Sequence, residues 1–307
     1  MNKTKIFLVL ALILPGFIAN AAIKDSKKAY DIILLAKNFN SGTVAYVNNY
    51  EEEKDRLLEL AQDPNEIEVI RVGAIWGLRN YSNDEKIYRA LKELAQDSNE
   101  ILPVRKQAIH VLGDFFNKPE LTKFIMNIAQ DINEPIEVRT QAIYSLRFRL
   151  HTGNDRKFMI SLADYNSEKT IKTYAIRVLG RYAGKPEVKD FLKDTYRNAD
   201  KDIKIEALRA MAWSSANPDI KDFLLDNLRN VSEIEIKVAF IRSLFYITHH
   251  PEVTPKLQDL TTDDQAAIRE AAIRTLSRET RYFAEWICPE HAAECERMLD
   301  PGYPYKP

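Results

Sequence analysis

The chain has 307 residues, of which 45% are hydrophobic and 29% are charged. This composition excludes a globally disordered chain, and the length fits either two ordinary domains or one long repeat array. The 44 basic and 45 acidic residues give a formal net charge of -1. Because proteins that bind duplex nucleic acid are normally basic, the charge argues against nucleic acid as the partner.

Residues 1–21 have the pattern of a secretory signal peptide. Lys3 and Lys5 precede an apolar run over residues 6–14, and Ala19 and Ala21 form a small-x-small cleavage pattern. The run is shorter than the roughly 20 residues of a membrane span, and no cysteine follows it for a lipid anchor. We expect cleavage after Ala21, with an uncleaved amphipathic anchor as the alternative. The mature chain would have a net charge of -3 without the two lysines, lack a transmembrane segment, and be periplasmic or secreted.

Residues 22–50 are expected to form an N-terminal helical cap, with a helix near 29–37 and a break at 38–42. A repeat array is expected to follow over residues 51–280. One motif, which reads VIRVGAIWGL at 69–78 and PVRKQAIHVL at 103–112, occurs seven times there. Its copies are spaced 32 to 34 residues apart, as their basic residues show: Arg71, Arg105, Arg139, Lys172, Lys204, Lys237 and Arg269.

Each motif predicts a helix, because apolar or small residues lie at positions −1, +3, +4 and +7 relative to the basic residue. A first helix is predicted before each motif, and four of these start at a proline: Pro119, Pro186, Pro218 and Pro251. A single helix pair cannot bury its apolar stripes, so the pairs must stack. The predicted fold is all-α: a right-handed α-solenoid, or superhelix, of about seven helix-turn-helix repeats.

The recurring pattern resembles the HEAT family over roughly residues 51–280, in particular the short HEAT-like class found in phycobilin lyases. Tetratricopeptide repeats share the period, but their tryptophan-leucine-glycine-tyrosine pattern is missing. Phe240 stands where the pattern has a small residue, which predicts a looser helix approach in that repeat. The resemblance, together with the leader, suggests an exported bacterial member whose second helices line the concave side.

HEAT-like enzymes provide the catalytic alternatives. Family members that hydroxylate a modified lysine hold two irons with His-Glu dipeptides, and this chain has none. A HEAT-like DNA glycosylase would have a basic groove, which the net charge of this chain does not favour. Phycobilin lyases act in the cytoplasm, which the predicted signal peptide argues against. His249 and His250 lie before a proline and are expected to be turn residues. No Gly-rich phosphate loop or nucleophile motif occurs, so we expect neither an enzyme nor a cofactor.

The basic residue of each motif could form an anion-binding ladder, but it lies at the edge of the apolar arc of its helix. An aspartate stands eight residues earlier in four repeats: Asp63, Asp97, Asp131 and Asp164. The resemblance to HEAT arrays implies that these groups tie neighbouring turns together. We therefore expect the ladder to be structural.

Two columns of side chains are expected to face solvent along the groove. The first, five residues after the basic one, contains Trp76, His110, Tyr144, Arg177, Arg209, Arg242 and Arg274. The second, four residues further on, contains Asn80, Asp114, Phe148, Arg181, Trp213, Tyr246 and Arg278. Exposed aromatic side chains mark interaction sites, and arginines beside aromatics have the composition of binding hot spots.

The prediction is a non-catalytic scaffold that binds a protein or peptide in the groove, and an acidic partner is one expectation. Arg209 and Arg274 have Glu206 and Glu270 on their own helices, whereas Arg177 and Arg242 have no such acidic neighbour and are expected to be free for a ligand. The alternative is a binder of an anionic polymer such as a polysaccharide, nucleic acid or lipid headgroup. The predicted partner-binding residues are Tyr144, Phe148, Arg177, Arg181, Arg209, Trp213, Arg242, Tyr246 and Arg274.

Residues 281–307 are expected to form a C-terminal cap and an extended tail. Cys288 and Cys295 are the only two cysteines, and an even number in an exported chain favours a disulfide. In a continuous helix they would lie about 10.5 Å apart along the axis, too far for a bridge, so a break at Pro289 is required. A Cys288/His291/Cys295 metal cluster and free thiols are the alternatives.

Overall fold

The computed structural model describes residues 50–115, 118–165 and 168–287, and these residues contain helices but no strand. The all-α prediction is confirmed over this part of the chain. None of the helices described there is long and apolar enough to cross a membrane. The predicted leader, the cap at 22–50 apart from Tyr50, the Cys288 and Cys295 pairing and the tail lie outside the described residues.

The chain forms two compact units, with the boundary after Arg149. The N-terminal unit contains three helix pairs in which each first helix packs on the second, and α4, α6 and α8 pack on one another in order. The pairs are α3 (Tyr50–Gln62) with α4 (Glu68–Gly77), α5 (Glu85–Gln96) with α6 (Leu102–Gly113), and α7 (Glu120–Gln130) with α8 (Ile136–Ser145); the 3-10 helix η1 (Leu78–Tyr81) follows α4.

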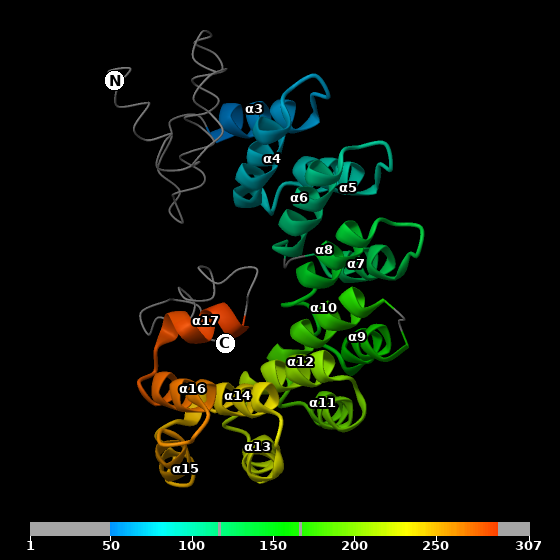
Figure 1. Ribbon diagram of the computed structural model, residues 1–307. Coiled ribbons are helices and arrows are strands. Elements are labelled where there is room, and N and C mark those ends of the chain that lie inside the picture. Colours follow the sequence, from blue (N-terminus) through cyan, green and yellow to red (C-terminus); the bar gives the residue numbers. More distant parts are fainter. Residues whose placement is uncertain (1–49, 116–117, 166–167, 288–307) are drawn as a thin grey trace, which may run out of the picture. The chain divides into compact units, whose positions relative to one another are not determined.

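The C-terminal unit contains four more pairs and a final helix (Figure 1). Its second helices α10, α12, α14 and α16 also pack in order. The elements are α9 (Gly153–Tyr165) with α10 (Lys169–Leu179), η2 (Gly180–Tyr182), α11 (Pro186–Asn198) with α12 (Lys201–Ala212), α13 (Pro218–Asn230) with α14 (Ile234–Ser243), η3 (Phe245–Ile247), α15 (Thr254–Leu260) with α16 (Ala266–Leu276), and α17 (Thr280–Ile287). The seven pairs confirm the seven predicted repeats, and each unit is a stack of the helical-solenoid class.

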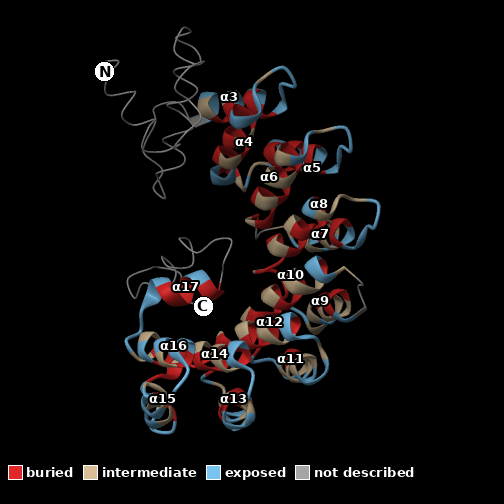
Figure 2. Cartoon of the chain, in the orientation of Figure 1, coloured by how far each residue is buried: buried red, intermediate tan, exposed pale blue. Residues whose placement is uncertain are grey.

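The motif supplies the core between the helices of each unit (Figure 2). Its recurring small residue is buried in six repeats, as Ala74, Ala108, Ala142, Ala175, Ala207 and Ala272 show. Phe240 takes this position in the sixth repeat and is fully buried. Its ring packs edge-on against that of Tyr196 on α11, at 5.2 Å between centroids. The larger side chain is therefore accommodated against an aromatic ring of the preceding pair.

The basic ladder is structural, as predicted, but its acidic partners differ from those expected. Arg71 donates to the carbonyl oxygen of Ala61 and, at 2.9 Å, to Glu100 of the next pair. Asp63 instead holds its own turn, because its carboxylate accepts the backbone N–H of Asn65 at 2.9 Å. At Arg71 and Arg105 the tie between neighbouring repeats is thus made by a glutamate 29 residues further along the chain. Lys172 instead donates to the backbone carbonyl oxygen of Asp164, eight residues before it, and Lys237 pairs with Asp263.

The proline-based helix starts are correct for α11 and α13, which begin at Pro186 and Pro218. They are displaced elsewhere: α7 begins at Glu120, one residue after its proline, and α15 begins only at Thr254. Before α15 the backbone N–H of Val253 donates to the carbonyl oxygen of His250 at 2.9 Å, so this stretch forms a turn. Pro255 then takes the first-turn position of α15.

Gly180, at the C-terminal end of α10, lies close to the backbone of α12. A Cβ atom there would lie 2.9 Å from Cδ1 of Trp213 and 3.0 Å from Cα of Ala210. Because the Ala210 backbone cannot move without shifting α12, we expect Gly180→Ala to lower the free energy of unfolding by about 2 kcal/mol, as overpacking typically does. Urea denaturation of the full chain measures this change.

The matched control for this substitution is Gly184→Ala in the following turn. Its Cβ would lie 3.6 Å from the Ser214 hydroxyl, which is ordinary van der Waals contact. We expect a change of at most about 0.5 kcal/mol there. Equal effects at both glycines would contradict the tight approach of α10 and α12.

Candidate binding face on the second helices

The second helices of each unit have one side packed on the first helices and an opposite side, here called the second-helix face. The first predicted column lies on these helices, as expected. The second column lies beyond their C-terminal ends: Phe148, Trp213 and Tyr246 follow α8, α12 and α14, and Arg181 lies in η2. The two columns therefore do not lie on one continuous helix, because the chain tightens into turns or 3-10 helices after the second helices.

In the N-terminal unit three rings from successive second helices stand next to one another. The ring centroids of Trp76 and His110 are 5.4 Å apart, and those of His110 and Tyr144 are 6.1 Å apart. The Gln141 side-chain amide lies 3.3 Å from Nδ1 of His110. All three rings are half-buried. The predicted residue Tyr144 is therefore one end of an aromatic row that crosses three repeats.

Arginines flank this aromatic row. The guanidinium carbon of Arg147 lies 4.2 Å from the ring centroid of Tyr144 and 4.7 Å from that of Phe148, which are cation–π distances. Arg79 lies 4.5 Å from the ring centroid of Trp76. The carboxylate of Asp114 is 3.4 Å from Arg79 and 4.0 Å from Arg147. Sequence reasoning missed Arg147 because its position falls outside both columns.

Burial raises the pKa of Asp114, although the neighbouring arginines lower it in part. The carboxylate is thus partly removed from water while it stands between two cations. It provides a negative charge between the two guanidinium groups that stand beside the aromatic row.

In the C-terminal unit, Glu206 joins two of the predicted arginines. Its carboxylate accepts from Nε of Arg177 at 3.0 Å and also pairs with Arg209 on its own helix. The Arg209 pair was predicted. The expectation that Arg177 is free for a ligand is wrong, because it considered acidic neighbours on the same helix only, whereas Glu206 comes from the following repeat.

The expectation for Arg242 is wrong for a related reason. Its Nε donates to the Tyr282 hydroxyl on α17 at 2.7 Å. Arg274 forms the predicted pair with Glu270 at 3.1 Å and a second one with Glu279 at 2.8 Å. Both arginines are therefore engaged by groups within the C-terminal unit.

The remaining predicted residues form an aromatic cluster. Arg181 lies 5.2 Å from the Trp213 ring centroid, and the rings of Trp213 and Tyr246 are 6.2 Å apart. Burial raises the pKa of Tyr246 far above its usual range. The ring of Phe283 lies 5.2 Å from that of Tyr246. The structure thus brings Arg181, Trp213 and Tyr246 together and places a side chain of α17 beside them.

Sequence reasoning missed the α17 side chains as part of this face. Tyr282, Phe283, Trp286 and Ile287 are buried, and their spacing of i, i+1, i+4 and i+5 is that of one helical stripe. This pattern could have predicted a helix with a buried side. It could not have identified the surface on which that side packs.

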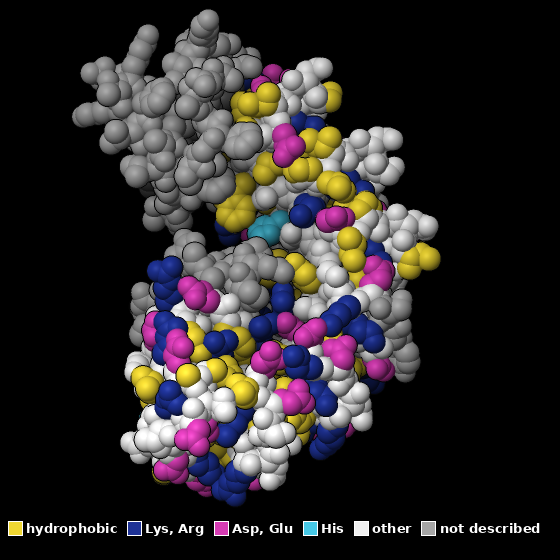
Figure 3. All heavy atoms as spheres, viewed as in Figure 1, with side chains coloured by type: hydrophobic (Ala, Val, Ile, Leu, Met, Phe, Trp, Pro, Cys, Tyr) yellow, Lys and Arg dark blue, Asp and Glu magenta, His cyan; other side chains and the backbone are white. Residues whose placement is uncertain are grey.

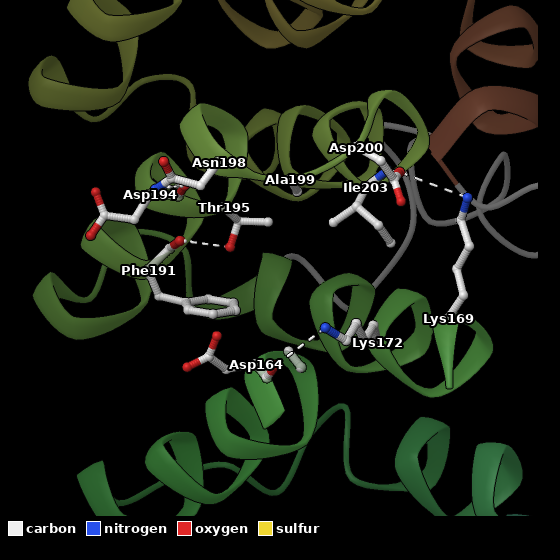
Figure 4. A pocket seen from close by; sticks show the side chains of 11 residues that line it. Asp164, Lys169, Lys172, Phe191, Asp194, Thr195, Asn198, Ala199, Asp200 and Ile203 are labelled. Carbon is white, nitrogen blue, oxygen red and sulfur yellow. Dashed lines mark hydrogen bonds and ion pairs between the residues drawn. The ribbon is translucent and has the colours of Figure 1, made fainter. Parts of the chain in front are cut away.

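A separate cavity of about 510 Å³ opens between α9, α10, α11 and α12 (Figure 4). Its two lysines are already paired: Lys172 donates to the carbonyl oxygen of Asp164 at 3.2 Å, and Lys169 pairs with Asp202 at 2.6 Å. Asp194 and Asp200 also line it. Charged side chains of both signs therefore stand close together around the cavity.

Charged side chains are mixed across the C-terminal unit as well. On the side seen in Figure 3, Lys and Arg side chains alternate with Asp and Glu side chains over this unit, so neither sign dominates it. Within residues 50–115, 118–165 and 168–287, no group of three or more His, Cys, Asp or Glu side chains is placed to hold a metal ion.

Residues 54–147 match the family model described as HEAT repeats. No curated protein matched the chain in sequence. Similar solved structures include YibA of Escherichia coli, at 15% identity over 91% of this chain and 93% of that chain with a TM-score of 0.47. The complex of CpcE and CpcF of phycocyanin lyase from Nostoc is 15% identical over 78% of this chain and 92% of that chain, with a TM-score of 0.43. Importin beta is 14% identical over 89% of this chain and 41% of that chain, with a TM-score of 0.44. The HEAT-repeat match thus covers residues 54–147, and helix pairs that carry the same motif continue up to Leu276.

Proposed function

We propose that the chain is a non-catalytic scaffold that binds a protein or peptide partner on its second-helix face, and that it does so in the periplasm or as a secreted protein. Repeat solenoids of this class are typical binding scaffolds, because stacked helices present an extended surface. The location rests on the signal-like residues 1–21.

The observation that carries the proposal is the row of half-buried aromatic rings flanked by arginines on the second helices. Trp76, His110 and Tyr144 expose part of their rings, and Arg79 and Arg147 stand over two of them. Tyrosine, tryptophan and arginine are the residue types enriched in binding hot spots, since they combine large apolar area with directed polar groups. A protein or peptide surface fits this chemistry.

The ion pairs favour a protein partner over an anionic polymer. Arg177 and Arg209 share Glu206, and Arg274 pairs with two glutamates. A polyanion would have to replace these carboxylates, which are already in place at hydrogen-bonding distance. Polyanion binding relies instead on uncompensated cations and the counterions that they release.

The test immobilises the chain from residue 22 and captures partners from an extract of the cell envelope or secreted fraction. We expect the double variant Trp76→Ala, Tyr144→Ala to capture at least about tenfold less of the bound protein, because truncating a hot-spot residue costs 2 kcal/mol or more. The matched control is Phe124→Ala, which removes a half-buried aromatic side chain from the first helix α7. Capture by each variant is measured at a temperature well below the midpoint of its thermal unfolding.

Capture by the double variant equal to that of the wild type would reject the second-helix face as the site. Salt separates the two partner classes. Binding to a protein should change by less than about tenfold between 50 and 200 mM salt, whereas a polyanion held by six or more phosphate or sulfate contacts would lose about a thousandfold. The steep loss would replace the protein partner by an anionic polymer.

A further inference from the structure

Helix α17 lies on the second-helix face of the C-terminal unit, opposite the first helices α11, α13 and α15 (Figure 1). One side of α17 is buried, and it carries Tyr282, Phe283, Trp286 and Ile287. Its other side is exposed, with Arg281 paired to Glu285 at 3.1 Å. The helix is therefore amphipathic and is seated through its aromatic side.

Each aromatic side chain of α17 has a partner on the face. The Tyr282 ring lies between Arg242 and Arg274, whose guanidinium carbons are each 4.3 Å from its centroid. The Phe283 ring is stacked on that of Phe245 at 4.2 Å. The α17 seat, defined by Arg209, Arg242, Phe245, Tyr246 and Arg274, thus binds a helix by stacking and cation–π contacts.

The fit of α17 to this seat is incomplete at Arg209. The Trp286 ring lies over the guanidinium at 5.5 Å from its centroid to the guanidinium carbon, and among the described residues the buried Nε has no hydrogen-bond partner. Burial lowers the pKa of Arg209; Glu206 raises it in part, and Arg177 and Arg242 lower it. A buried donor without an acceptor weakens the folded arrangement that creates it. A helix that offered an acceptor there would remove this cost.

The link to α17 is also strained. Arg278 has a φ of 53°, in the left-handed region, and it is the one non-glycine residue with positive φ in the described part of the chain. This conformation turns the chain back from α16 toward the seat, at a steric cost for a side chain with a Cβ atom. Moreover, α17 has only eight residues, and such a short helix is marginal unless it is docked.

We propose that the α17 seat is a docking site for an aromatic amphipathic helix of a partner protein, and that α17 occupies the seat in cis until such a helix displaces it. This inference rests on the proposed function and specifies the chemistry of the partner. The partner helix carries aromatic residues at positions i, i+1 and i+4, the spacing of Tyr282, Phe283 and Trp286 in α17.

The experiment uses the full chain and needs no identified partner. The release variant is Phe283→Ala, Trp286→Ala, and the matched control is Arg281→Ala, Glu285→Ala on the exposed side of α17. We expect hydrogen exchange of the α17 amides to become at least about tenfold faster in the release variant and to stay unchanged in the control. Tyr282→Phe keeps the ring but removes the hydroxyl that accepts from Arg242, and it should speed exchange by about two- to tenfold.

The probe is a fluorescent peptide of residues 278–287. Because α17 competes for the same seat, the peptide should bind the release variant at least about tenfold more tightly than the wild type or the control. Peptide affinity that is equal in all variants would overturn the proposal, and so would unchanged exchange of α17 in the release variant.

Fast exchange of α17 without peptide binding would show that the seat does not dock helices, and would also reject the proposal. If the α17 amides are protected from hydrogen exchange only at protein concentrations where the wild type dimerises, the seat holds α17 of a second copy. The proposal that α17 occupies the seat of its own chain would then be wrong. The peptide readout is independent of partner capture through Trp76 and Tyr144, so failure of one test is distinguishable from failure of the other.

Discussion

Glu206→Ala should lower the free energy of unfolding by about 3 kcal/mol, because it leaves a buried guanidinium without its carboxylate. Glu206 is buried, with 8% of its surface exposed. It accepts from Arg177 at 3.0 Å and pairs with Arg209, whose Nε has no hydrogen-bond partner in the part of the chain that the structure describes. Urea denaturation of the full chain, followed by circular dichroism, measures the change.

A second substitution at Glu206 separates charge from hydrogen bonding, and a substitution at an exposed ion pair is the control. Glu206→Gln keeps an acceptor oxygen but removes the charge, and we expect it to cost about half as much as alanine. Glu235→Ala breaks the exposed pair with Lys201, and we expect a change below about 0.5 kcal/mol. A loss below about 1 kcal/mol for Glu206→Ala would mean that water replaces the carboxylate and that the site is not dry.

Arg105→Ala should have a comparable effect in the N-terminal unit, with a loss of about 3 kcal/mol. Only 2% of the Arg105 surface is exposed. Its Nε and Nη2 donate to the carbonyl oxygen of Ala95, and Nη2 lies 2.7 Å from both carboxylate oxygens of Glu134. The substitution removes a link between two consecutive helix pairs and leaves their acceptors unsatisfied.

Lysine at position 105 tests the geometry of this link. Arg105→Lys retains the charge, but an ammonium group cannot reproduce the planar fork that reaches both acceptors, so we expect a loss of about 1 to 2 kcal/mol. The control is Arg89→Ala, which breaks the exposed pair with Glu85 and should cost less than about 0.5 kcal/mol. Equal stability of the alanine variants at 105 and 89 would contradict the structural role of the ladder.

The fold followed from the sequence because its information is local and repeated. The spacing of apolar residues around Arg71 and its six counterparts specified the second helices. The turn at Asp63 is also local, because the Asp63 carboxylate accepts from the backbone N–H of Asn65, two residues later. Where two local signals competed, the prediction was less accurate. The chain near Pro251 formed a turn, since Pro255 provided a second start for α15.

The candidate site was predicted in part for the same reason. The positions of Tyr144, Arg177, Arg209 and Arg242 on the second helices followed from helical periodicity alone. Their partners did not, because the side chains that meet across a repeat are about 30 residues apart in sequence: Glu206 lies 29 residues after Arg177, and Tyr282 lies 40 after Arg242. No pattern within one helix predicts a contact between residues that lie 29 to 40 positions apart in the sequence.

The sequence by itself therefore determined the repeat unit, the number of helix pairs and the residue types that stand on the second-helix face. The tertiary structure alone decided which of these side chains are engaged. The stripe of Tyr282, Phe283 and Trp286 specifies an amphipathic helix wherever it lies, because amphipathicity depends only on spacing. Its seat on α12, α14 and α16 depends on ring stacking, on cation–π contacts and on the left-handed turn at Arg278, which form only when the repeats are packed.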